Sequence, residues 1–440
     1  MNPDLSTLAP EAAPAPVLDR APTWTELAAR FRPIFATIAE GAAAREQNRE
    51  LAYEAVNLLR EAGFGALRVP REYGGAGITL AQLFRLLVEL GEADSNLPQI
   101  LRAHLAFVEL RLNSDDAAQK ALWFKRVVDG ALVGAAMAER TDATENTVKL
   151  TREGDGEGAV WRLNGRKFYC TGTIYADWVS AAAADGDVRL SVMVPTTAPG
   201  VTRLDDWDGF GQRLTGSGTT VFEDVEVPEE NILRRFNLGE FRADSYITAF
   251  YQQMHLAALA GIGRAVLRDA VAFVQAKTRA FGVPGQSSPR TDPLVQRVIG
   301  RLSSLSFALE AVVDSVSAAL DAAHEAWKAG AADEALYDAA DIKAFQGQQV
   351  AIDLVLQATS LMFEVGGASA TQEARRLDRH WRNARTIASH NPAIARERLL
   401  GDHLLNGVSP RQDWASRWKK PEAEAEVLAE APASEPAPAA

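Results

Sequence analysis

Residues 211–233 read GQRLTGSGTTVFEDVEVPEENIL, a glycine-rich turn followed by a run of β-type residues. Within TTVFEDVEVP, apolar and polar side chains alternate, which is typical of a strand with one buried face. Similar short runs separated by turn residues occupy the chain from about residue 148 onward: VWRLNG, KFYCTG, DWVSAAAA, RLSVMVP and GVTRL. The centre of the chain is therefore predicted to be a mostly antiparallel β domain.

Apolar residues recur at helical spacing on both sides of this β region. Before it, helices are predicted from about Trp24, over residues 51–62 with Gly63 as a stop, and after Thr79. More helical sequence reaches about Asp129. After the β region, four long amphipathic segments predict a helical bundle: residues 244–278, 291–327, 333–364 and 370–388.

The predicted fold class is therefore α+β and mainly α, with helices, a β domain and helices in that order. The pair Gly261 and Gly263 predicts close helix packing rather than a phosphate loop. We expect a disordered tail over residues 1–22 and an acidic disordered tail over residues 411–440. Between them we expect an N-terminal helical domain over residues 23–134, a central β domain over residues 135–240 and a C-terminal four-helix bundle over residues 241–410.

Composition narrows the class of protein. The chain has 440 residues and a net charge of −12, which argues against sequence-independent nucleic-acid binding. A single cysteine, Cys170, can form neither an intrachain disulfide nor a thiolate zinc cage. The sequence contains no uncharged apolar stretch long enough to cross a membrane. It also does not begin with basic residues followed by an apolar stretch, which is the pattern of a signal peptide. We therefore expect a cytoplasmic protein that binds no nucleic acid and no membrane.

Several kinds of catalytic motif are missing. The one G-x-G-x-x-G/A match, GDGEGA at residues 154–159, is acidic and leads into a strand, so it predicts a hairpin turn rather than a dinucleotide site. The chain has no Walker loop, no H-E-x-x-H and no G-x-S-x-G. None of its six histidines is paired at helical spacing, so no metal site is predicted.

The order of segments and five motifs resemble the acyl-CoA dehydrogenase fold over roughly residues 25–408. The motifs are LREAGFGALRVPREYGGAG, NGRKFYCTGTIYADW, GQRLTGSGTTVFEDVEVPEENIL, RAFGVP and FEVGGASA. Dehydrogenases of this family use a carboxylate to remove a proton beside a thioester carbonyl. The expected Glu is absent after RNARTIA, residues 382–388, and the alternative stretch ITAFYQQMHLAALAG, residues 247–261, contains no Asp or Glu. The resemblance therefore disfavours ordinary acyl-CoA dehydrogenation.

The ending SHNPAIARERLLGDHLLNG, residues 389–407, is similar to another branch of the fold, the reduced-flavin-dependent monooxygenases of the dibenzothiophene monooxygenase type. Those enzymes accept FMNH2 from a separate NAD(P)H:flavin reductase, react it with O2 and deliver one oxygen atom from a C4a-hydroperoxyflavin. The resemblance implies FMN rather than FAD, because Ser369 replaces the third glycine of the FAD-type pattern. It also implies a homotetramer.

The resemblance assigns catalytic roles to His390, His104 and Cys170. Both histidines are expected to face the reactive edge of the flavin, where a group titrating near neutral pH can donate a proton. The alternatives are a helix cap for His390 and a core histidine for His104. Cys170 stands where relatives often carry a hydroxyl near flavin N5 or O4, and its alternative is a small buried hydrophobe.

The resemblance also assigns cofactor contacts, most of which have a structural alternative. Arg279 and Phe281 are expected to bind the FMN phosphate of a neighbouring subunit, and the alternative for Arg279 is a solvated helix-end cation. Gly366 and Gly367 either allow close backbone approach to phosphate or end a helix. The remaining predicted contacts are Ala138, Glu139, Thr171 and Ser389.

The predicted function is thus a two-component FMNH2-dependent monooxygenase acting on a small apolar, sulfur- or nitrogen-containing or aromatic molecule. Trp207, Phe210 and Tyr251 are candidate pocket walls. One alternative is a flavin acyl-CoA dehydrogenase or oxidase with an unrecognised base. Another is a catalytically silent scaffold that retains only the fold.

Overall fold

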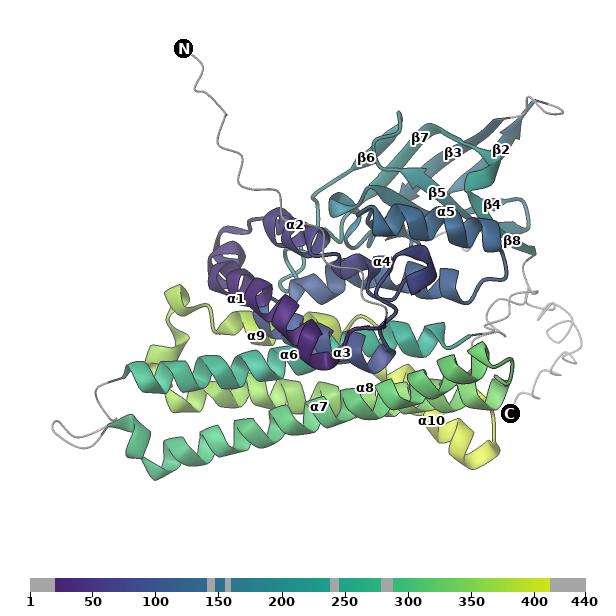
Figure 1. The fold of residues 1–440 in the computed structure, drawn as a ribbon. Helices are drawn as coiled ribbons and strands as arrows, with labels where there is room; N and C mark the ends of the chain where they lie inside the picture. Colours follow the sequence, from purple (N-terminus) through teal and green to yellow (C-terminus); the bar gives the residue numbers. More distant parts are fainter. Residues whose placement is uncertain (1–19, 141–146, 155–159, 238–244, 278–287, 412–440) are drawn as a thin grey trace, which may run out of the picture.

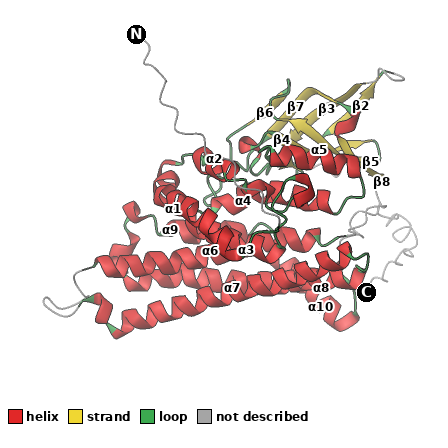
Figure 2. Cartoon of the chain, viewed as in Figure 1, coloured by secondary structure: helices red, strands yellow, loops and turns green. Residues whose placement is uncertain are grey.

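The computed structural model describes residues 20–140, 147–154, 160–237, 245–277 and 288–411. Helices come first along the chain, then a sheet, then longer helices, as predicted (Figures 1 and 2). Figure 1 shows the sheet and the long C-terminal helices on opposite sides of the N-terminal helices. The N-terminal helices therefore contact both of the other regions.

The N-terminal region contains α1 (Trp24–Asn48), α2 (Tyr53–Glu61), α3 (Leu80–Ala93), α4 (Asn96–Leu112) and α5 (Ala117–Val128). Thr79 caps α3 and forms a reciprocal capping box with Gln82, which satisfies free N–H groups of the first turn. Gly63 follows α2 in the left-handed conformation with φ of 66°, which favours glycine. The predicted stop and start signals of these two helices are thus confirmed.

The central region is an eight-stranded sheet of β1 (Val133–Ala136), β2 (Lys149–Glu153), β3 (Val160–Lys167), β4 (Trp178–Asp185), β5 (Val188–Pro195), β6 (Val201–Arg203), β7 (Thr220–Val227) and β8 (Ile232–Asn237). The order is β6-β7-β3-β2-β4-β5-β8, and β1 pairs with β4. The sheet is mostly antiparallel, as predicted, with parallel contacts of β4 to β1 and β2. The predicted domain boundary between residues 134 and 135 falls inside β1.

The C-terminal region contains α6 (Ile247–Ala276), α7 (Pro293–Lys328), α8 (Glu334–Leu361), α9 (Asp378–Ala388) and α10 (Ala393–Asn406). The predicted fourth helix over residues 370–388 is wrong at its start, because α9 begins only at Asp378. Short 3-10 turns over Met362–Val365, Gly367–Thr371 and Glu373–Arg375 precede it. Gly367 is left-handed with φ of 53°, which breaks the helical repeat.

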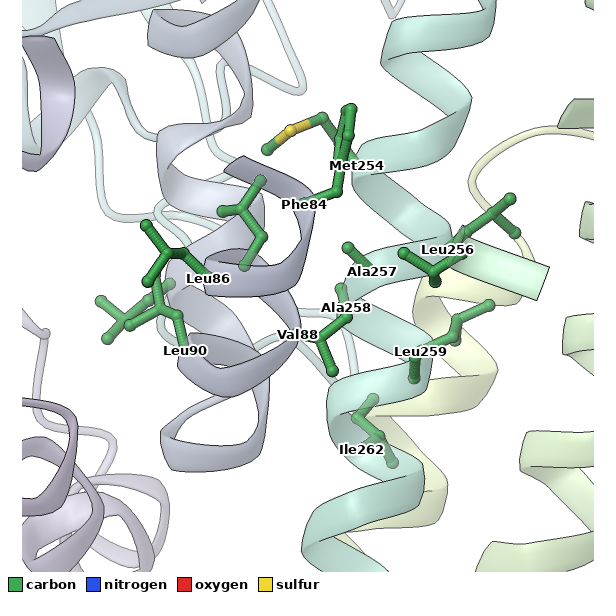
Figure 3. Close-up of a cluster of buried hydrophobic side chains, with 14 of the residues drawn as sticks. Phe84, Leu86, Val88, Leu90, Met254, Leu256, Ala257, Ala258, Leu259 and Ile262 are labelled. Carbon is green, nitrogen blue, oxygen red and sulfur yellow. The ribbon is translucent and has the colours of Figure 1, made fainter. Parts of the chain in front are cut away.

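The largest core cluster joins α3 to α6 (Figure 3). Gly261 of α6 packs against Gly91 of α3 so closely that a Cβ on Gly261 would lie 2.6 Å from the Gly91 carbonyl carbon. This contact confirms that Gly261 serves close helix packing. Figure 3 labels other side chains of the two helices, among them Phe84 and Leu90 of α3 and Met254 of α6, all of which are buried. The interface fixes α4, which follows α3, beside the C-terminal helices.

One described helix, α7, is long and apolar enough to cross a membrane by length and composition alone. It packs against α6 and α8 along the bundle in Figure 1, and residues such as Leu302, Leu309 and Leu320 are buried there. A core helix of a globular protein meets the same criteria, so this feature is weak evidence for a membrane span.

Candidate active site

A cleft of about 650 Å³ lies where the three regions meet. Its volume falls within the range of about 300–1,000 Å³ that is common for small-molecule sites. Its walls come from α4, from the chain after β1 and β3, from the turn before β7, and from α9 with the loop after it. The lining residues are Gln99, Arg102, Ala103, Ala135, Met137, Ala138, Tyr169, Thr171, Trp207, Gly209, Phe210, Gln212, Thr215, Ser217, Thr386, Ile387, Ser389 and His390.

Three hydroxyl groups form a directed hydrogen-bond chain along one wall. Thr215 Oγ1 donates to the Gln212 carbonyl at 2.8 Å and lies 2.7 Å from Ser217 Oγ, which is 2.7 Å from Thr171 Oγ1. A carbonyl can only accept, so Ser217 must donate to Thr215 and Thr171 must donate to Ser217. The Thr171 oxygen is thereby left as an acceptor at the cleft.

The expected position of Cys170 in the site is corrected. Cys170 is 1% exposed and packs in the core of the sheet, where burial raises the pKa of its thiol to about 11. Its neighbours Tyr169 and Thr171 line the cleft instead. Tyr169 has a φ of 60°, so the chain turns here and places Cys170 in the sheet core while its two neighbours line the cleft. Thr171, and not Cys170, is therefore the residue of this pair that presents a polar side chain to the cleft.

Aromatic side chains form the mouth of the cleft. Tyr169 and Phe210 are more than half exposed, and the Tyr169 and Trp207 rings lie 6.2 Å apart. Phe210 stacks on Trp381 of α9 with an angle of 16° between the rings. Trp207 and Phe210 thus form cleft walls as predicted, whereas Tyr251 lies behind the lining, against Arg102. These faces suit a flat or apolar ligand.

His390 lines the cleft, and its tautomer follows from its partners. Its Nε2 lies 3.2 Å from Nη2 of Arg102, and its Nδ1 lies 3.3 Å from Oδ1 of Asn391. A guanidinium only donates, so Nε2 accepts and the proton is on Nδ1. Desolvation by the surrounding protein, followed by the Arg102 charge, lowers the pKa of His390 to about 3. This shift runs against titration near neutral pH, and the expected role of His390 stays a prediction.

His255 of α6 was missed as a site residue by the sequence analysis. Its ring centroid lies 4.3 Å from that of His390, and it is 2% exposed. Neither ring nitrogen has a hydrogen-bond partner among the described residues. Burial lowers the pKa of His255 well below its usual value. Its position in residues 247–261, where some relatives carry the catalytic base, was the available signal.

His104 does not line the cleft, which corrects the expectation that it faces the flavin. The ring is 1% exposed, with Nε2 3.0 Å from the Gly65 carbonyl and Nδ1 accepting from the Val133 amide at 3.2 Å. Burial lowers the pKa of His104 to about 4. Both nitrogens therefore hold backbone groups of the core, which is the alternative that the sequence left open.

Of the predicted cofactor contacts on the chain after β1, Ala138 lines the cleft and Glu139 does not. The Glu139 carboxylate pairs with Lys167 at 2.5 Å and accepts from Thr147 N at 2.7 Å and Thr147 Oγ1 at 2.6 Å. Lys167 also donates to the carbonyl of Met137 at 3.3 Å. This buried pair positions the backbone of the cleft wall instead of contacting a ligand in the cleft.

The remaining predicted contacts are dispersed. Ser389 lines the cleft, and Arg385 donates to its hydroxyl. Gly366 and Gly367 do not line it, and Gly366 instead packs so closely against α6 that a Cβ there would meet the Phe273 ring. Arg279 and Phe281 lie outside the described residues. Among the described residues, no group of three His, Cys, Asp or Glu side chains could hold a metal ion.

The hydrogen-bonding groups of the cleft fit a flavin ring. Oε1 of Gln99 and Oε1 of Gln212 are buried and without partners among the described residues, so both can accept from ring N–H groups. Thr171 offers a third acceptor, and the guanidinium of Arg102 offers N–H donors in the same cleft. No Asp or Glu lines this cleft among the described residues. The cleft therefore offers no carboxylate for removing a carbon-bound proton.

Helices, a sheet and helices around such a cleft define the acyl-CoA dehydrogenase fold. Family models of acyl-CoA dehydrogenases match on both sides of the sheet, the N-terminal domain over residues 25–131 and the C-terminal domain over residues 253–393. Together they cover more than half of the chain. The chain belongs to the acyl-CoA dehydrogenase family of folds.

Curated relatives with monooxygenase names match most of the chain. Dibenzothiophene monooxygenase of Rhodococcus erythropolis is 28% identical over 374 residues, which is 80% of this chain and 86% of that protein. A probable FMNH2-dependent monooxygenase of Pseudomonas putida, SfnC, is 27% identical over 371 residues, 81% of this chain and 89% of that one. FMN-bound TdsC of Paenibacillus sp. A11-2 superposes with a TM-score of 0.78 at 25% identity, covering 87% of this chain and 98% of TdsC. By distant homology, the chain is an enzyme of the FMN-dependent monooxygenase branch.

Proposed function

We propose that this protein is the oxygenase component of a two-component system that uses FMNH2 and O2 to oxygenate a small organic molecule. The observation that carries the proposal is the cleft itself, which combines flavin-sized space, unpaired acceptors and no acidic side chain among the described residues. The similarity to FMNH2-dependent relatives supports the choice of cofactor.

Bound reduced FMN would supply the two electrons that activate O2, and O2 itself would supply the transferred oxygen atom. Thr171 accepts a hydrogen bond from a ring N–H, because its own proton is committed to Ser217. Arg102 provides donors beside the ring of His390. Tyr169, Trp207 and Phe210 exclude bulk water from the reacting atoms, which protects a reactive oxygen species from wasteful breakdown.

The proposal extends to partners and assembly. A separate NAD(P)H:flavin reductase supplies FMNH2, which agrees with the lack of a dinucleotide-binding motif in the sequence. The protein acts as a cytoplasmic homotetramer in which Arg279 and Phe281 reach the FMN phosphate of a neighbouring subunit. Exposed apolar side chains of α7 and α10 are suited to the subunit contacts: Phe307, Ile394, Leu404 and Leu405, each at least three-quarters exposed.

A coupled assay tests this proposal. The protein, a generic flavin reductase, FMN and NADH are incubated under ¹⁸O2 with a panel of sulfinates, thiophenes, sulfones, amines and phenols. We expect one ¹⁸O atom in the product of at least one panel member, and none when the reductase or FMN is omitted. Tight binding of FAD and its bleaching by an acyl-CoA would instead establish the dehydrogenase alternative, and failure to bind any flavin would leave only the fold.

A further inference from the structure

Arg102 is a cation in the cleft that the described protein does not neutralise. It extends from α4, its Nη2 lies 3.2 Å from His390 Nε2, and its guanidinium lies 5.3 Å from the centre of the Tyr251 ring. Its Nε is buried without a partner, and no hydrogen bond joins its Nη1 to a described residue. The contacts with His390 and Tyr251 orient the guanidinium but bring no negative charge.

Two other arginines in the interior of this protein are each matched by a carboxylate. Arg68 pairs with Glu109 at 2.6 Å, and Arg45 pairs with Asp94 at 3.0 Å. Arg102 has no ion pair among the described residues, although the chain carries a net charge of −12. Burying an unmatched charge is costly unless a ligand compensates it.

The groups packed around Arg102 do not change this balance. Neither His390 nor His255 can bring a negative charge, because an imidazole ring is neutral or positive in this pH range, and burial lowers the pKa of His255 well below its usual value. The next charged group along this side is Arg396 of α10, whose guanidinium donates to the side-chain oxygens of Gln252 and Gln348. The wall beside His390 is therefore positive. A guanidinium with free N–H groups is suited to a planar or tetrahedral oxyanion.

We infer that Arg102 binds an oxyanion group of the substrate, so that the substrate class is small organic sulfinates, sulfonates or carboxylates with an apolar remainder. The inference rests on the proposed function and adds the chemistry of the molecule that is oxygenated. The apolar remainder of the substrate contacts the aromatic wall of Tyr169 and Trp207. A full anion compensates the guanidinium charge, which a neutral thiophene or a carbonyl oxygen of oxidised FMN cannot do.

Calorimetric titration of the FMN-saturated protein tests the inference without turnover. The ligands are benzenesulfinate and its neutral analogue methyl phenyl sulfone, with benzoate and benzamide as a second pair. We expect the anions to bind the wild type at least about tenfold more tightly than their neutral analogues, because charge-assisted hydrogen bonds are the strong ones. Raising the salt concentration should weaken only the anions.

Three variants complete the test. Arg102→Gln should lose at least about tenfold in anion affinity and leave the affinity for the neutral analogues unchanged. Arg102→Lys should retain part of the anion affinity. Arg85 is an exposed arginine outside the cleft lining, so Arg85→Gln should match the wild type. Equal anion affinity in wild type and Arg102→Gln would overturn the inference while leaving the proposed function intact. So would an Arg102→Gln protein that loses FMN affinity and keeps anion affinity, because the guanidinium would then serve the flavin. If the wild type binds no FMN, the proposed function itself fails, which flavin fluorescence detects separately.

Discussion

Thr171 and Cys170 are adjacent in sequence, yet the structure gives them opposite roles. Replacing Thr171 by Val removes the acceptor at the cleft and the donor to Ser217. A neutral hydrogen bond contributes about 0.5–1.5 kcal/mol, so FMN affinity should fall about two- to tenfold. Stability should change little, because Ser217 also lines the cleft and water can replace the lost donor. Thr171→Ser, which keeps the hydroxyl, should bind FMN like the wild type.

Replacing Cys170 by Ala should have the reverse effect. The thiol is 1% exposed in the sheet core, so its removal leaves a small void and costs about 1 kcal/mol of stability. FMN affinity should stay unchanged, because the thiol points away from the cleft. Flavin fluorescence titration and thermal unfolding of the same samples measure both quantities. If Cys170→Ala weakened FMN binding at full stability while Thr171→Val bound normally, the assignment of the two side chains would be refuted.

Three further variants test the site and its support. His390→Ala should leave FMN binding intact and divert consumed O2 to H2O2. In the wild type, the yield of oxygenated product per O2 consumed should show no His390-dependent inflection near pH 6.5, because the pKa of His390 is lowered to about 3. A peroxidase-coupled assay across pH measures both quantities, and an inflection that this variant abolishes would contradict the neutral ring. Glu139→Gln should cost about 3–5 kcal/mol because it removes the carboxylate that neutralises buried Lys167, whereas Lys125→Gln at an exposed pair should leave the thermal midpoint unchanged. Equal midpoints in the two variants would show that the buried pair is not needed. Burial raises the pKa of Asp341 to about 7 from 3.8, so folding favours its protonated form and stability falls as pH rises between these values; the midpoint of Asp341→Asn relative to wild type should therefore increase from pH 4 to pH 7, and a difference that is constant with pH would contradict the shift.

The spacing of apolar residues along the sequence was sufficient to predict the order of helices and strands. Alternation of period two marked most of the strands, and the Thr79 cap and Gly63 stop bounded helices because capping is local chemistry. The start of α9 was mispredicted because residues 370–377 continue an amphipathic pattern after Gly367 has already broken the helix. Local periodicity does not reveal such a break when the following residues keep the same pattern.

The site was only partly predictable. His390, Thr171, Ala138 and Ser389 do line the cleft, but nothing in the sequence showed which side of the chain Cys170 faces. Tyr169 has φ of 60°, and this turn sets the direction of the next two side chains. His255 and Arg102 matter through contacts across α4, α6 and the loop after α9, which are tertiary distances. His104 matched a motif position, yet its ring nitrogens bind backbone.

The central claim is that the cleft protects reduced flavin in its reaction with O2 and does not take hydrogen from a thioester. Stopped-flow mixing of the protein and photoreduced FMN with oxygenated buffer tests this claim before any substrate is known. We predict a transient species whose absorbance differs from those of reduced and oxidised FMN. This species should decay more slowly than free reduced FMN reoxidises, and His390→Ala should shorten its lifetime. Reoxidation at the rate of free flavin, with bleaching of bound oxidised flavin by an acyl-CoA, would contradict the account.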